Sequence, residues 1–333
     1  MKRSILTAWV LIFIVFGLGL AGLAGRSVLR EEKKLQVPDP GAADSAVTIR
    51  VQVDGTVQEM NLDEYVQGVL RAEMPASFEL EALKAQAVAA RTETLYKAEN
   101  GPVANHPDAD ICDDIQCCQA YLSEEEAENA WGKDADTYAA KIATAVRETD
   151  GMVILYEDKP ILAAFFSSAS GQTNNSGDVW VNDLPYLQSV QSPEGEDEVP
   201  NYYSVATFSA EEFKELFLAE YPQADLEGDP ESWFGGETRN DSDMVLTMTV
   251  GGVEVKGTAM RALFSLRSAS FTISVEGDEI TFHVTGYGHG VGMSQYGANV
   301  LAQEGKDYQE ILTWYYTGVT IGPYSPKNLA SAE

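Results

Sequence analysis

Basic side chains are scarce in this sequence. Lysine and arginine together number 22 among 333 residues, against 52 aspartates and glutamates, so the formal net charge at pH 7 is -30. Proteins that bind nucleic acid draw much of their affinity from lysine and arginine on phosphates, and anionic membrane surfaces attract basic segments in the same way. A chain this acidic is therefore a poor partner for either one. Its composition favours a neutral, zwitterionic or cationic partner.

Several common motifs of catalysis and nucleotide binding are absent as well. The sequence contains no G-x-x-x-x-G-K-[ST], H-E-x-x-H or G-x-S-x-G, and the glycine-rich run 286–292 lacks the spacing that binds a dinucleotide. Internal repeats and low-complexity blocks are also lacking. The 44% of hydrophobic residues exclude wholesale disorder, and the length indicates one large domain or two.

A long apolar run occurs at the N-terminus. Lys2 and Arg3 precede about 20 uncharged residues, which as a helix would cross about 30 Å of hydrocarbon. Small residues at 21–25 leave a cleavable signal peptide open as the alternative. We expect residues 1–26 to form a single-pass membrane anchor and residues 27–46 to form a linker. The rest of the chain then lies outside the cytoplasm.

Hydrophobic periodicity divides residues 47–325 into segregated helices and hairpins, followed by a tail at 326–333. Strands are predicted at 47–53, 152–156, 161–166, 244–250, 253–256, 269–275 and 279–285. Helices are predicted at 61–71, at 82–97 after a Ser77 cap, at 123–149, 209–220 and 258–265, and after the glycine-rich run. Loops are predicted at 101–121 and 167–202, and an acidic loop extends to about 243. Because β-α-β alternation is lacking, we expect an α+β fold with two lobes and a substrate cleft.

All three cysteines lie close to one histidine. His106, Cys112, Cys117 and Cys118 fall within thirteen residues. One interpretation is a disulfide from Cys112 to Cys117 or Cys118, with one thiol left over. The other is a tetrahedral zinc site made by all four residues. Four protein ligands would leave no open position, so such a zinc would be structural.

Glu73 is the strongest candidate for a catalytic acid. It lies near the expected C-terminus of a helix, beside apolar residues and just before Pro75. The negative end of the helix dipole and desolvation both raise a carboxyl pKa, as a general acid requires. The alternative is a packing role, in which Glu73 pairs with Arg71 or Arg91.

Two further segments suit a sugar ligand. Ser168, Ser170 and Gly171 belong to a hydroxyl-rich turn that follows an apolar strand. His289 lies among glycines, where a backbone can approach a ligand closely, and it precedes a helix that carries Gln295 and Tyr296. An ordinary polar loop and a structural turn are the alternative interpretations.

Three long segments together resemble the stage II sporulation protein D family. They are LDEYVQGV at 62–69, AEMP at 72–75 with EALKAQAVAART at 81–92, and GHGVGMSQYGA at 288–298. The resemblance covers about residues 47–323. It implies a peptidoglycan lytic transglycosylase on the engulfing mother-cell membrane of a spore-forming bacterium, with the stage II sporulation proteins P and M as partners.

The resemblance also implies roles for particular residues. Glu73 matches the catalytic glutamate, and His106, Cys112, Cys117 and Cys118 match a loop that binds structural zinc in some members. The residues that we assign to substrate binding are Arg91, Ser168, Ser170, Gly171, His289, Gln295 and Tyr296. A Cys at position 117, where other members can have His, departs from the pattern.

A lytic transglycosylase needs fewer carboxylates than an ordinary glycosidase, which uses two. The muramyl C6 hydroxyl of the substrate acts as the nucleophile, so one acid/base residue suffices. Two other functions compete with this one. The chain could be a non-catalytic enhancer of a cell-wall amidase, or a zinc amidase or peptidase that uses the 106–118 loop.

Overall fold

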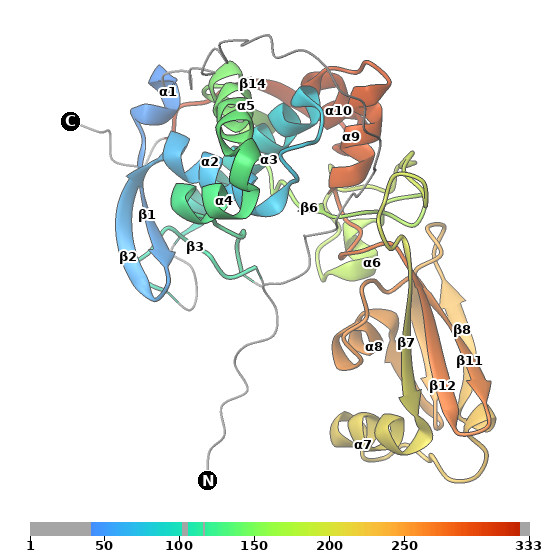
Figure 1. Cartoon of the computed structure of the whole chain (residues 1–333). Helices are drawn as coiled ribbons and strands as arrows, with labels where there is room; N and C mark the ends of the chain where they lie inside the picture. The colour runs from blue at the N-terminus through green and yellow to red at the C-terminus, as the bar shows by residue number, and fades with distance from the viewer. Residues whose placement is uncertain (1–40, 102–105, 116, 327–333) are drawn as a thin grey trace, which may run out of the picture. The chain divides into compact units, whose positions relative to one another are not determined.

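The structure, a computed structural model, describes residues 41–101, 106–115 and 117–326 (Figure 1). It has mixed α+β architecture, as predicted. Buried hydrophobic side chains form two clusters, one drawn from residues 49–187 and 291–316 and the other from residues 213–284. We call residues 41–202 and 286–326 the first lobe, and residues 203–285 the second lobe. The second lobe is therefore an insertion in the chain of the first.

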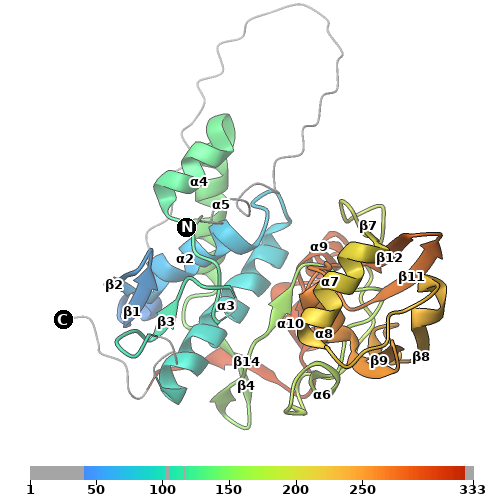
Figure 2. The ribbon, with the colours of Figure 1, turned by 90° about the horizontal axis from the view of Figure 1, so that it is seen from below.

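The first lobe is built around the central helix α3. The helices of its N-terminal part are α1 (Ala42–Ser45), α2 (Leu62–Glu73), α3 (Leu80–Asn100), α4 (Glu124–Trp131) and α5 (Ala135–Glu148). The alanines at 82, 85, 87, 89 and 90 on α3 are all fully buried, so the helices α2, α5, α9 and α10 pack closely around it (Figure 2). Strand β1 (Thr48–Val53) pairs antiparallel with β2 (Thr56–Asn61) and parallel with β3 (Ile111–Cys112).

The C-terminal part of the chain returns to the first lobe. Strand β14 (Thr320–Pro323) and the short β5 (Lys159–Pro160) both pair with β4 (Met152–Tyr156). Strand β6 (Phe165–Phe166) pairs in parallel with β13 (Met293–Ser294). The remaining helices are α6 (Ser176–Val179), α9 (Gln295–Gln303) and α10 (Tyr308–Tyr315). The β6–β13 pair therefore joins two segments that lie far apart in the sequence.

The second lobe consists of two small sheets with helices packed on them. The sheet β11–β12–β7 joins Phe271–Glu276, Glu279–Thr285 and Tyr203–Ser209. The sheet β10–β9–β8 joins Val253–Lys256, Val245–Val250 and Phe234–Arg239. Helices α7 (Ala210–Glu220) and α8 (Gly257–Leu263) complete the lobe, and Phe213 on α7 stacks on Phe264 at 4.6 Å between ring centroids.

Several predicted elements differ in the structure. The helix predicted at 123–149 is two helices, because the chain turns at Gly132, whose φ is +57°. Helix α3 begins at Leu80, and the Asn299 side chain, rather than Ser77, accepts a hydrogen bond from the Glu79 N–H at 2.8 Å. Strands β7, β8 and β14 were not predicted. Strands β7 and β14 have half-exposed sequences and are stabilised by β12 and β4, which are distant in the chain. Strand β8 pairs with the neighbouring β9, and its exposed, irregular pairing gives little alternation to detect in the sequence.

The predicted linker 27–46 is too long at its C-terminal end. Helix α1 belongs to the folded lobe, and Asp44 within it is only 1% exposed. The predicted membrane anchor at 1–26 and most of the tail at 326–333 lie outside the described residues. Across the described ranges, no helix is both long and apolar enough to cross a membrane.

Candidate functional site

Glu73 is the last residue of α2, where the chain stops being helical before Pro75. Its carboxylate accepts a hydrogen bond from the Ala120 N–H at 2.8 Å. Burial raises the pKa of Glu73, while the hydrogen bond from Ala120 and the side-chain amide of Gln295 lower it. Gln295 Nε2 has no partner in full hydrogen-bonding geometry among the described residues. Glu73 is thus a desolvated carboxylate with an amide group beside it.

Helix α9 carries two predicted residues, Gln295 beside this carboxylate and Tyr296 next to it in the chain. Ser294 caps the helix by accepting a hydrogen bond from the Gly297 N–H at 3.2 Å. The Tyr296 N–H donates to the Ser167 carbonyl at 3.0 Å, and its ring meets Phe78 edge-on at 5.0 Å. Because Phe78 lies in the loop that follows Glu73, the 73–78 segment and the start of α9 form one site. The sequence predicted these residues but not their proximity.

Glu194 supports the site, and the sequence analysis missed it. It is 3% exposed and accepts hydrogen bonds from the Ala169 N–H at 2.7 Å, from the Ser192 hydroxyl at 2.6 Å and from the Ser294 hydroxyl. Glu194 therefore ties the 167–171 turn to the first residue before α9. A side chain at Gly297 would begin 2.5 Å from its Oε2, so glycine is required there. Sequence offered no signal, because Glu194 is one acid among 52 in a polar loop.

His289 is enclosed by aromatic rings. Its ring lies 5.3 Å from that of Trp180 and 5.6 Å from that of Phe166. Burial, and secondarily the charge of Arg261, lower its pKa to about 4. The Val291 N–H donates to Nδ1 at 3.1 Å, so the proton of the neutral ring is on Nε2. His289 is consequently a neutral hydrogen-bonding group at pH 7 and cannot serve as a cationic acid there.

The hydroxyl-rich turn is mainly a scaffold. Ser168 is 2% exposed and exchanges backbone hydrogen bonds with Tyr287 at 2.8 and 3.0 Å. The Ser170 hydroxyl bonds to the Ser242 carbonyl at 2.9 Å and to the Ser270 hydroxyl at 3.0 Å. Gly171 turns the chain with a φ of +95°. The turn thus connects the two lobes, and neither serine side chain is free on an open surface.

The assignment of Arg91 to substrate binding is wrong. The side chain is fully buried, and its guanidinium is hydrogen-bonded to both carboxylate oxygens of Asp44 at 2.6–2.9 Å. It also donates to the Met152 carbonyl at 3.1 Å. A buried guanidinium needs such partners, because leaving it unpaired is costly. Arg91 holds α1 against the core, where no substrate reaches it, and it does not pair with Glu73.

The three cysteines converge, but the histidine does not join them. The sulfur atoms of Cys112, Cys117 and Cys118 lie within 4.8 Å of one another, and all three are free thiols. Among the described residues, His106 lies outside this group. Three converging sulfur donors, partly buried, suit a soft metal such as zinc. The structure therefore contains three of the four predicted ligands at one place, and the disulfide alternative is not formed.

Similarity to known proteins covers most of the chain. The stage II sporulation protein D of Bacillus subtilis is 38% identical over 307 residues, which are 90% of this chain and 87% of that protein. The chain belongs to the stage II sporulation protein D family. The family model described as stage II sporulation protein matches residues 52–156, which include Glu73 and the cysteines. The resemblance that the three sequence segments indicated is thereby confirmed.

Two further relatives bear on function. The stage II sporulation protein D of Bacillus amyloliquefaciens is 38% identical over 285 residues, which cover 85% of this chain and 81% of that protein. The amidase enhancer of Bacillus subtilis is 28% identical over 319 residues, which cover 78% of this chain but only 40% of that protein. Proteins similar to this chain thus include two named for sporulation and one named for enhancing an amidase.

Proposed function

We propose that this protein is a lytic transglycosylase that cleaves the MurNAc–GlcNAc bond of peptidoglycan and leaves anhydromuramyl ends during engulfment. The observation that carries the proposal is the environment of Glu73. Glu73 is partly buried, and this desolvation raises its pKa, so the carboxyl group holds a proton at a higher pH than an exposed one, which suits a general acid. The site also offers uncharged polar and aromatic groups, Gln295 and Tyr296, that suit a sugar.

The reaction balances with this single carboxyl group. Protonated Glu73 donates its proton to the GlcNAc O4 as the bond from the muramyl C1 to that oxygen breaks. The resulting carboxylate then accepts the proton of the muramyl C6 hydroxyl, whose oxygen bonds to C1 and closes the anhydro ring. No water is consumed. Because O6 belongs to the same sugar as C1, proximity replaces a second catalytic carboxylate.

Neighbouring groups support both halves of the cycle. The Ala120 N–H hydrogen bond stabilises the carboxylate that forms when Glu73 gives up its proton. The Gln295 amide beside Glu73 can orient the carboxyl group, and it remains uncharged throughout. Glu194 acts as a positioning residue, because it fixes Ser294 at the start of α9.

We also propose that Cys112, Cys117 and Cys118 hold a structural zinc ion, and that His106, which lies outside their group in the structure, would approach to become the fourth ligand when the metal binds. The convergence of the three sulfur atoms supports the site. Zinc there would join β3 to the 117–118 segment, which leads to Ala120 beside Glu73. With four protein ligands it would have no open position for water, so the metal would stabilise the fold and take no part in bond cleavage.

The cellular setting is part of the same proposal. We place the chain on the engulfing mother-cell membrane through an anchor at 1–26, with the described residues outside the cytoplasm. Its partners there are glycan strands and the stage II sporulation proteins P and M. The net charge of -30 supports the absence of nucleic acid among its ligands.

The test is digestion of glycan strands freed of stem peptides, with products read by mass spectrometry. The full chain should produce anhydromuramyl ends, and Glu73→Gln should produce none. Glu64→Gln is the matched control, because Glu64 is an exposed glutamate on the same helix. This variant should cleave glycan like the wild type. Products that gain a water would indicate hydrolysis and refute the transglycosylase.

A second candidate is the non-catalytic enhancer, which the similarity to the amidase enhancer favours. In that case neither the wild type nor Glu73→Gln releases products from any glycan. Instead, addition of the folded protein would accelerate a separate cell-wall amidase, and Glu73→Gln would retain that effect.

A further inference from the structure

The outer face of the β11–β12–β7 sheet exposes two large side chains. Tyr203 is 61% and Val205 is 64% exposed, and both lie on the same face of β7. The strand register places Thr285 opposite Tyr203 and His283 opposite Val205, and Thr272 on β11 lies opposite His283. Helix α7 packs on β7 and β12 and lies on the other side of the sheet, so this face is open (Figure 1).

This face carries little charge, although the protein as a whole is strongly acidic. Beyond the pairs already named, its outward side chains include Thr207, Thr281 and Ser274. Carboxylates on these strands are confined to the far end, where Glu276 pairs with Glu279 across the hairpin. The carboxylate that lines a hollow at one end of this face, Asp243, is paired with Arg239 at 3.5 Å. The face therefore has a low net charge on a chain with a net charge of -30, which favours an uncharged ligand.

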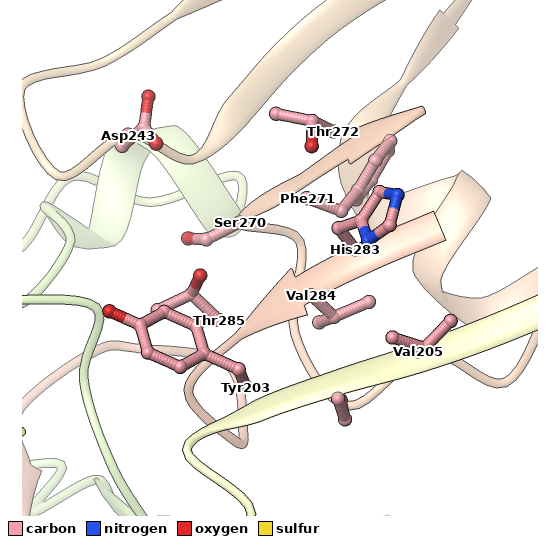
Figure 3. Close-up of a pocket in the computed structure, with 10 residues that line it drawn as sticks. Tyr203, Val205, Asp243, Ser270, Phe271, Thr272, His283, Val284 and Thr285 are labelled. Carbon is pink, nitrogen blue, oxygen red and sulfur yellow. The ribbon is translucent and has the colours of Figure 1, made fainter. Parts of the chain in front are cut away.

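A hollow of ≈ 340 Å³ lies at one end of this face. Its walls include Tyr203, Thr285, Ser270 and His283, with Asp243 at the edge (Figure 3). Figure 3 shows the hydroxyl groups of Tyr203, Thr285 and Ser270 gathered on one side of the hollow and the His283 ring on the other.

The lining has the chemistry of a carbohydrate site. Hydroxyl and imidazole groups both donate and accept hydrogen bonds, which suits the hydroxyls of a sugar. The exposed Tyr203 ring and Val205 supply an apolar surface for the C–H face of a sugar ring. His283 is oriented by its contact with Ser274, whose hydroxyl lies 3.0 Å from Nε2. Few precisely placed polar groups on an apolar base are typical of ligand pockets.

Hydrogen bonds connect this hollow to the site at Glu73. The hydroxyl of Ser270, in the wall of the hollow, lies 3.0 Å from the hydroxyl of Ser170, which belongs to the hydroxyl-rich turn. In the same turn, the Ser167 carbonyl accepts a hydrogen bond from the Tyr296 N–H at 3.0 Å. Tyr296 adjoins Gln295, the residue beside Glu73. The turn therefore links the hollow to the start of α9 through two hydrogen bonds and the backbone between Ser167 and Ser170.

We propose that this hollow is a second glycan-binding site, which holds sugars of the strand away from the bond that is cleaved. The choice of glycan as the ligand rests on the proposed function, because that function has glycan as its substrate. Holding the strand at two places would lower the KM for long strands and leave the chemistry at Glu73 unchanged.

The test measures binding rather than cleavage, in the full chain carrying Glu73→Gln. Adding Tyr203→Ala should weaken binding of long, stem-peptide-free glycan strands about three- to tenfold, the range expected for one aromatic contact. His283→Ala, made separately, should also weaken it. Val57→Ala, at a 42% exposed strand position in the first lobe, is the control and should bind normally. Circular dichroism confirms that each variant is folded.

The outcomes separate this proposal from the proposed function. If the folded Tyr203→Ala and His283→Ala variants both bind glycan like their parent, the second site is refuted, whether or not the wild type cleaves. If they lose affinity for isolated stem peptides but not for glycan, the hollow is a peptide site and the proposal is also wrong. If they lose glycan affinity while the wild type forms no anhydromuramyl ends, the second site stands and the transglycosylase fails.

Discussion

Removing Asp44 should destabilise the first lobe strongly. Its carboxylate bonds to the buried guanidinium of Arg91 at 2.6–2.9 Å, and neither side chain is more than 2% exposed. In Asp44→Ala the guanidinium retains only uncharged acceptors, such as the Met152 carbonyl at 3.1 Å. Removing one partner of a buried ion pair costs about 3–5 kcal/mol. In a folded unit of about 150–250 residues this corresponds to a Tm lower by about 6–20 °C.

Calorimetry of the full chain measures this Tm. The control is Glu227→Ala, because the Lys214–Glu227 pair is on the surface, where Glu227 is 84% exposed and a pair contributes about 0–1 kcal/mol. The double variant Asp44→Ala with Arg91→Met removes both charges and should recover much of the lost stability. If Asp44→Ala lowers the Tm no more than Glu227→Ala does, the buried pair does not hold α1 to the core and our reasoning is wrong.

Three further predictions concern the candidate site. Burial raises the pKa of Glu73, so its ionised form costs stability at pH 7. Glu73→Gln should therefore raise the Tm at pH 7. This gain should disappear as the pH falls below 4.5, the ordinary pKa of a glutamate, because the carboxyl group is then protonated in both the folded and the unfolded chain. An equal gain in Tm at pH 7 and below pH 4.5 would contradict the prediction. Glu194→Ala should lower kcat on glycan strands about ten- to hundredfold by displacing α9. Glu194→Gln should retain more activity, because its amide oxygen can still accept a hydrogen bond. Equal kcat in the two variants would argue against a role of Glu194 in positioning α9. Cys112→Ser should lose bound zinc, measured by elemental analysis of the folded protein, whereas Ser77→Ala should keep it; unchanged metal content in Cys112→Ser would exclude the site.

Local sequence patterns were enough to predict several secondary-structure elements, the catalytic candidate and the family of this protein. The alternating residues of β1, the Asn61 cap of α2 and the alanine-rich face of α3 depend on neighbours within a few positions in the chain. Glu73 could be singled out because its helix end and the following proline are adjacent to it. Three long motifs also sufficed to identify the family, which the comparison over 90% of the chain confirmed.

Only the tertiary structure decided which of those residues meet. Gln295 lies beside Glu73 because β13 pairs with β6 and α9 packs on α3, and both contacts join segments distant in the chain. Arg91 was assigned to substrate binding from its place in a family motif, but the fold buries it against Asp44. Glu194 looked like any other loop acid, although it accepts three hydrogen bonds. A sequence shows how residues are spaced along the chain. Burial and long-range pairing depend instead on how the whole chain packs, and this packing determines which polar groups have partners.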